Sequence, residues 1–139
     1  MELQFRAWSK NNEEMVYQNI KSSNFGYGSL TASAILLQFD HEFIMQYSGM
    51  QDKFNNKIYD KDILQLVDDA GNEINVICKY GKHERKMDSG FLVEIYGFAF
   101  MSPLGKPTFP IIHNYAGKSD LDIMEVIGNV YETPELNVW

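Results

Sequence analysis

The sequence lacks the features of a disulfide-stapled, secreted or membrane-spanning protein. Cys78 is the single cysteine among 139 residues, so no intramolecular disulfide can form. No apolar run approaches the roughly 18–20 residues that a membrane-spanning helix needs. The first residues also lack a basic segment followed by an apolar one, which is the pattern of a secretory signal. These absences predict a cytoplasmic protein without membrane contact, in which Cys78 is a small buried side chain on a strand.

Basic residues are also few. The chain has 12 Lys and Arg against 19 Asp and Glu, which gives a net charge of -7. An acidic surface repels phosphate backbones, so non-specific nucleic-acid binding is disfavoured. The exception is the basic cluster at 79–86, in which 81–86 is expected to be a charged loop and the one basic concentration. Its candidate binding residues for nucleic acid or an acidic partner are Lys82, His83, Arg85 and Lys86. A solvated hairpin tip is the favoured alternative.

The patterns that carry catalysis or metal binding are missing as well. The three histidines lie far apart without ligand spacing and are expected on the surface or in loops. No G-x-S-x-G pentapeptide is present to hold a nucleophilic serine. The carboxylates that most merit attention are Asp60 and Asp62, because apolar residues flank them closely. The sequence therefore predicts no enzyme, no metal and no cofactor, unless a site is assembled only in the fold.

What the sequence does contain is a composition typical of a folded β protein. Hydrophobic residues make up 45% of the chain and charged residues 22%, so wholesale disorder is excluded. Aromatic residues make up 14%, which suits the packed faces of pleated sheets. The length fits one domain, residues 1–139.

Short apolar segments separated by polar turns run along the whole chain. The central segment is 45–63, which predicts a strand, a polar turn at 52–57, a short apolar pair and a tight turn at 60–62. A loop at 102–110 and a capped helical turn at 119–122 are also expected. The fold class predicted is mainly β: a single domain of highly bent, barrel-like antiparallel sheets with little helix. Its further expected strands are 3–8, 15–17, 34–39, 43–47, 63–67, 74–78, 91–101, 111–113 and 123–131.

The segment 91–101 has apolar residues on both parities. Phe91, Val93 and Ile95 alternate with Leu92, Tyr96 and Phe98. Such a pattern predicts a strand covered on both faces. Gly97 inside it indicates a bulge or a bend.

Three segments carry a family resemblance. They are FRAW at residues 5–8, then MQYSGM at 45–50 with the later IYDKDI at 58–63, and EVIGNVYETPEL at 125–136. In this order and spacing they resemble the YopX-like family of phage and prophage proteins. The middle of the chain, from about residue 66 to residue 121, has no matching signature.

The resemblance implies a fold of highly bent sheets, an origin in a phage or prophage, and self-association. It implies no established activity, so no catalytic residue is carried over. The motif residues are interpreted as structural, with Trp8 and Tyr59 as core anchors and Gly49 and Gly128 as positions that need backbone freedom. Pro134 is expected to end a strand. The full motif set is Trp8, Gln46, Tyr47, Gly49, Asp52, Tyr59, Asp62, Gly128, Asn129, Tyr131 and Pro134.

The chain departs from the family pattern at three positions. Ser9 stands where the family has Asp, Asn55 stands at the Gly of an Asn-Gly turn, and Lys61 replaces the Gly of Tyr-Glu-Gly-Asp. A non-glycine residue at a left-handed position costs about 1 kcal/mol. These changes affect the turn geometry and not the fold.

The function expected from the sequence is that of a phage or prophage accessory protein of the bacterial host cytoplasm. It would act by binding, without catalysis, as a homo-oligomer, with a host or phage protein as a further possible partner. The alternative is a small nucleic-acid-binding β-barrel that uses residues 79–86.

Overall fold

The first of two antiparallel sheets is built by the N-terminal half of the chain. The structure, a computed structural model, describes residues 3–18, 37–103, 105, 107–108 and 119–136. Strands β1 (Phe5–Ser9) and β2 (Glu14–Tyr17) form a hairpin, and β3 (Ile44–Gln51) pairs with β1 on one side and β4 (Lys57–Tyr59) on the other. The strand order is β2-β1-β3-β4.

The second sheet holds five strands in the order β8-β7-β6-β5-β9. Their bounds are β5 (Asp62–Val67), β6 (Glu73–Lys86), β7 (Leu92–Met101), β8 (Pro107–Thr108) and β9 (Met124–Asn129). One sheet is curled into a half-barrel. The helical elements described are short 3-10 turns: η1 (His41–Phe43), η2 (Asp120–Ile123) and η3 (Pro134–Leu136). The predicted fold class of bent antiparallel sheets with little helix is confirmed.

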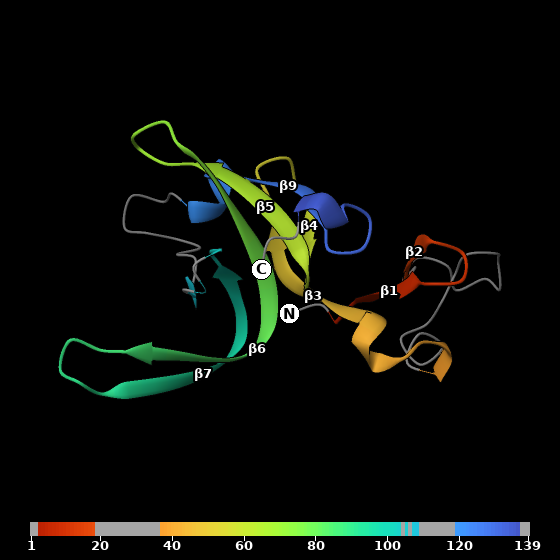
Figure 1. Cartoon of the computed structure of the whole chain (residues 1–139), viewed down its shortest axis with the longest axis horizontal. Helices are drawn as coiled ribbons and strands as arrows, with labels where there is room; N and C mark the ends of the chain where they lie inside the picture. The colour runs from red at the N-terminus through yellow and green to blue at the C-terminus, as the bar shows by residue number, and fades with distance from the viewer. Residues whose placement is uncertain (1–2, 19–36, 104, 106, 109–118, 137–139) are drawn as a thin grey trace.

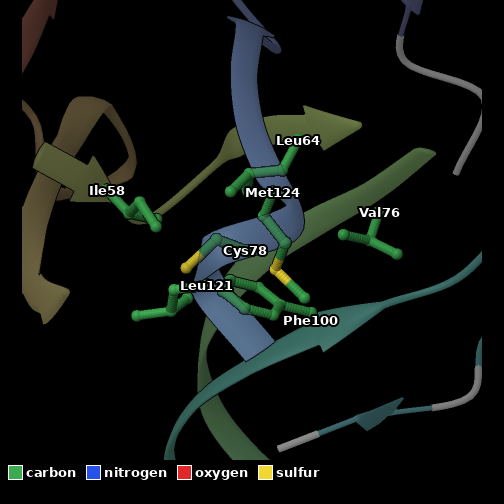
Figure 2. Packing of buried hydrophobic residues seen from close by; sticks show 7 residues of the cluster. All are labelled: Ile58, Leu64, Val76, Cys78, Phe100, Leu121 and Met124. Carbon is green, nitrogen blue, oxygen red and sulfur yellow. The ribbon is translucent and has the colours of Figure 1, made fainter. Parts of the chain in front are cut away.

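A hydrophobic core cluster lies on one face of the second sheet. Alternation puts residues of one parity on that face, so Leu64, Val76 and Phe100 meet there from three neighbouring strands (Figure 2). Ile58 from β4, Leu121 from η2, Cys78 and Met124 complete the cluster. Cys78 is fully buried on β6, as expected, and burial raises the pKa of its thiol well above the usual value.

Two hairpin turns have the same construction. Asp52 and Asp68 each accept hydrogen bonds from the backbone N–H groups two and four residues later, at 2.8–3.0 Å. Asn56 and Asn72 each return a side-chain hydrogen bond to the second carboxylate oxygen. Because Asp and Asn side chains can replace missing backbone partners, both turns satisfy their amides locally.

The predicted central segment passes from one sheet to the other. The turn at Asp60 and Lys61 follows β4 of the first sheet and precedes β5 of the second. The Asp60 N–H donates to the Gln46 carbonyl in the first sheet, and the Lys61 N–H donates to the Cys78 carbonyl in the second. These residues therefore join the two sheets through the backbone.

The β6–β7 hairpin extends away from the rest of the molecule (Figure 1). Its ladder is continuous from the pair Ile77–Met101 to the pair Lys86–Leu92. The prediction of a charged loop at 81–86 is therefore wrong: these residues form the outer half of β6. The strand continues because every residue from Ile77 to Lys86 has a partner on β7, whatever its charge.

Two other predictions differ from the structure, and a third falls outside the described residues. Leu37 and Gln38 are helical, so the strand expected at 34–39 is wrong there, and residues 34–36 lie outside the described part. Pro134 begins η3, whereas β9 already ends at Asn129. The expected strand at 111–113 lies outside the described residues. Within the described ranges, no helix is long and apolar enough to span a bilayer.

Candidate functional site

A buried ion pair lies where the two sheets meet. Arg6 on β1 donates from its guanidinium to Asp62 Oδ1 at 2.6 Å, and both side chains are almost fully buried. Asp62 Oδ2 accepts from the Tyr59 N–H at 2.8 Å, and the guanidinium lies 4.6 Å from the centroid of the Tyr59 ring. Burial raises the pKa of Asp62, which Arg6 and the Tyr59 N–H oppose. Burial likewise raises the pKa of Tyr59 to about 12, with Arg6 opposing.

Asp60 connects this junction to the projecting hairpin. Its Oδ1 accepts from the Tyr80 N–H at 2.9 Å, beyond the point where β5 stops pairing with β6. Burial raises the pKa of Asp60, and the Tyr80 N–H and Lys61 counteract the increase. The Asp60 carboxylate thus accepts, at the base of the hairpin, a hydrogen bond that a neighbouring strand would otherwise accept.

Neither carboxylate is arranged for catalysis. Both carboxylate oxygens of Asp62 already accept hydrogen bonds, from Arg6 and from the Tyr59 N–H. Asp60 accepts a hydrogen bond from the Tyr80 N–H. The contacts of these two carboxylates give no support to the hypothesis of an enzyme site that is assembled only in the fold. Among the described residues, no group of three or more His, Cys, Asp or Glu is placed to hold a metal ion.

The C-terminal motif packs against the N-terminal one. The Trp8 and Tyr131 rings stack with centroids 5.6 Å apart and an interplanar angle of 7°. Asn129, which is buried, accepts from the N–H groups of Tyr131 and Glu132 and thereby holds the turn after β9. Tyr131 also donates to the Glu42 carbonyl and accepts from Lys61.

The other predicted motif residues have structural positions. Gly49 has a φ of +84° at the irregular pairing of β3 with β4. Gln46 pairs with Phe5, and Tyr47, which is buried, pairs with Tyr59. At Gly128 a Cβ would lie 2.0 Å from Thr133 Oγ1, so the glycine permits this close approach. Trp8 is half-buried whereas Tyr59 is buried, so only Tyr59 lies in the core.

An open pocket beside Trp8 is a second place to look for a ligand. Trp8, Phe39 and Phe43 supply its aromatic lining, and Lys10, Gln38 and Asp40 supply polar groups. Ser9, also on its wall, accepts a hydrogen bond from the Asn12 N–H in the β1–β2 turn. The Ser9 hydroxyl stabilises the β1–β2 turn, and these contacts do not pair it with a base as a nucleophile would be.

The projecting hairpin has two chemically different faces. We call residues 79–98 the arm. Its aromatic face consists of the side chains on one parity of both strands, which the register places in four cross-strand pairs. From base to tip these pairs are Tyr80–Phe98, Lys82–Tyr96, Glu84–Glu94 and Lys86–Leu92. The Tyr80 and Phe98 rings are in contact, with centroids 4.9 Å apart.

The four predicted binding residues are divided between the two faces. Lys82 and Lys86 belong to the aromatic face, whereas His83 and Arg85 belong to the opposite one. Lys82 is paired with Glu94 at 2.9 Å and with Glu84 at 3.7 Å, and the hydrogen bond to Glu94 raises the pKa of Lys82. The structure therefore does not gather these residues into one basic site.

His83 is a structural residue of the arm. Its Nε2 lies 3.1 Å from the Lys79 carbonyl and 3.2 Å from the Gly97 carbonyl, and the ring is buried. Since both neighbours are acceptors, Nε2 is the protonated nitrogen. Gly81 and Gly97 face one another across the ladder with φ of +154° and +158°, in the middle of a hairpin that bends in Figure 1. The prediction of a surface histidine is thus wrong for His83, and the ladder passes Gly97 without a bulge.

Sequence reasoning missed the exposure of the arm. Phe91 is 75% exposed and Tyr96 is 72% exposed, although apolar residues on both parities had predicted a strand covered on both faces. Leu92, Tyr80, Met87 and Val93 are exposed as well. The signal that could have revealed this surface was the contrast between apolar 91–101 and its charged partner 79–86.

The fold has a counterpart among solved structures. The crystal structure of protein EF1440 from Enterococcus faecalis is similar with a TM-score of 0.53 and 20% sequence identity, and the match covers 98% of each chain. A search of curated proteins gave no match. The family described as YopX protein matches residues 4–136, which include both the sheet junction and the arm. That match takes in all three motif segments, and it shows that the chain belongs to the YopX family.

Proposed function

We propose that this YopX-family chain is a phage- or prophage-encoded accessory protein of the bacterial host cytoplasm. It acts by binding and not by catalysis, and it works as a homo-oligomer. The observation that carries the proposal is the arm, whose apolar residues are patterned for burial and yet lie exposed in a single copy. Exposed apolar patches of this kind mark interaction surfaces.

The distribution of charge favours a second copy as the partner. The arm has four Lys and Arg and three Asp and Glu, a net charge of +1, whereas the rest of the chain has eight and sixteen, a net charge of -8. The arm is therefore the part of the chain at which electrostatic repulsion between two acidic copies is weakest. Self-association would also cover the exposed edges of both sheets.

Light scattering at micromolar concentration tests the proposal. We expect a particle larger than one chain, and we expect Tyr96→Ser to reduce its mass. Phe54→Ser is the matched control, because Phe54 is an aromatic residue 61% exposed in the β3–β4 turn, away from the arm. A wild-type protein that is strictly monomeric would contradict the proposal.

Nucleic-acid binding is the second candidate. Lys79 and Arg85 favour it, since both lie on the face opposite the aromatic one and the ion pairs of the described residues do not include either. Against it stand the net charge of +1 on the arm and the two glutamates on its aromatic face. Gel shifts at low salt test this candidate. Nucleic-acid binding is ruled out if the protein leaves the mobility of the nucleic acid unchanged, or if Lys79→Glu and Arg85→Glu bind as wild type does.

A further inference from the structure

We infer that the aromatic face of the arm pairs with the same face of a second copy across a two-fold axis. This inference rests on the proposed self-association and names the surface that mediates it. The first observation is that the face is continuous with the core. Phe100 is buried in the core cluster, Phe98 packs against that cluster, and the Tyr80 ring contacts Phe98. Beyond this point Tyr80, Tyr96 and Leu92 are 55%, 72% and 57% exposed.

The exposed aromatic area is large enough to be the centre of an interface. An aromatic side chain buries about 150–250 Å² when fully covered, so the two exposed tyrosines offer roughly 200–300 Å². A standard interface buries about 800 Å² on each partner. The tyrosines would therefore supply about a third of one side, and Leu92 and the tip residues Met87 and Phe91 extend the apolar surface.

The charges on this face balance. Lys82 and Lys86 are matched by Glu84 and Glu94, and Lys82 already contacts both glutamates within one chain. A face with no net charge and two carboxylates in its middle repels a polyanion locally. A partner that carries the same alternation of lysine and glutamate fits it better.

The order of the pairs makes the face self-complementary. The two-fold axis runs across the strands, between the Lys82–Tyr96 pair and the Glu84–Glu94 pair. Rotation about this axis places the Lys82–Tyr96 pair of one copy opposite the Glu84–Glu94 pair of the second copy, and the reverse. Lys82 then lies opposite the partner's Glu84. By the same operation Phe98 lies opposite the partner's Leu92, so apolar residues meet along β7 at both ends, while Tyr80 lies opposite the partner's Lys86 and Tyr96 opposite the partner's Glu94.

A charge exchange tests this pairing. Lys82→Glu and Glu84→Lys each place like charges opposite one another in a homodimer, and we expect each variant to associate at least tenfold more weakly than wild type. In a dimer of the two different variants, which an equimolar mixture can form, every such contact joins opposite charges. We therefore expect the mixture to recover the wild-type particle in sedimentation velocity. Lys79→Glu, a charge reversal on the other face of the arm, is the control expected to leave association unchanged.

The outcomes separate the two proposals. If wild type associates and both variants associate as tightly as it does, the aromatic face is not the contact, although self-association stands. If both variants dissociate but their mixture does not recover, the two-fold arrangement is wrong. A monomeric wild type would overturn both the inference and the proposed homo-oligomer. Circular dichroism of each variant checks that the fold is retained.

Discussion

Arg6 on β1 donates a 2.6 Å hydrogen bond to Asp62 at the start of β5, so one buried ion pair joins the two sheets. Its partners come from the first and second motif segments, 56 positions apart in the sequence. The Tyr59 N–H saturates the other carboxylate oxygen. Arg6 Nε is a buried atom without a hydrogen-bond partner among the described residues, so the pair is bound through one side of the guanidinium.

The first prediction concerns this pair. Arg6→Met should lower the free energy of unfolding by about 3–5 kcal/mol at neutral pH, because it leaves the Asp62 carboxylate buried and unpaired. Burial already raises the pKa of Asp62, and loss of Arg6 removes the main opposing influence. The destabilisation should therefore shrink as the pH falls and Asp62 takes up a proton. Urea unfolding at about pH 7 and about pH 4.5 measures it, and an equal loss at both values would contradict the prediction.

The second prediction concerns Asp52. Its carboxylate holds the β3–β4 turn and accepts from the Val126 N–H on β9 at 3.0 Å. Asp68 makes the same turn contacts at the β5–β6 hairpin, and its turn bonds are exposed. Asp52→Ala should cost about 2–4 kcal/mol and Asp68→Ala about 1 kcal/mol, because only Asp52 joins a turn to another strand. Equal losses in urea unfolding would show that the contact with Val126 contributes nothing.

Asp52 also sets a pH dependence. Burial acts to raise its pKa, but hydrogen bonds from Val126, Asn56 and Phe54 outweigh burial and leave the pKa below its usual 3.8. A lowered pKa in the folded state contributes stability that is present above the unfolded value and is lost as the pH falls through the folded one. Asp52→Asn should remove that part of the acid-induced loss. The test is whether its unfolding free energy declines less steeply than that of wild type below about pH 4.

The third prediction concerns two left-handed residues. Asn55 has a φ of +66° at the position that Gly71 occupies, with φ of +84°, in the matching turn. Asn55→Gly should raise the free energy of unfolding by about 0.5–1 kcal/mol, because it removes strain without removing a contact of the turn. Gly71→Asn, the reverse change, should lower it by a similar amount.

Lys61 provides the contrast. Its φ is +70°, but its Nζ donates to the Glu42 carbonyl and to the Tyr131 hydroxyl. Lys61→Gly relieves strain and loses both hydrogen bonds, so it should not stabilise the protein. Thermal unfolding of the three variants measures these effects, and a gain from Lys61→Gly equal to that from Asn55→Gly would overturn the reasoning.

The fourth prediction concerns Gly128. A Cβ there would lie 2.0 Å from Thr133 Oγ1, which donates to the Asn129 carbonyl and accepts from the Asn129 N–H. Gly128→Ala should cost about 2–4 kcal/mol, because Thr133 has to move and break these bonds. Gly71→Ala is the control: no described atom lies within 4 Å of its added Cβ, so only its positive φ costs energy, about 1 kcal/mol. A loss at Gly128 no greater than at Gly71 would contradict the steric account.

The turns and the strand alternation could be predicted from the sequence because both are local. Asp52, Asn56 and the alternating residues of β5 act on neighbours a few positions away. The Ser119 cap of η2 belongs to the same class. The contact of Arg6 with Asp62 could not be predicted, because it depends on how two sheets meet.

The extent of β6 was missed for a related reason. The charged residues Lys82 to Lys86 resemble a loop when read alone, and only the register with β7 makes them a strand. The apolar residues of β7 predicted a strand covered on both faces. That prediction is wrong for the outer half of the arm, which is exposed in a single copy.

Hydrogen exchange of the arm tests the central claim most directly. The amides of residues 82–86 and 92–96 should take up deuterium more slowly as the wild-type concentration rises from nanomolar to micromolar, while the β5–β6 turn at residues 68–72 keeps a constant rate. Uptake in the arm that does not change with concentration, in a protein whose particle mass does rise, would show that the copies meet elsewhere.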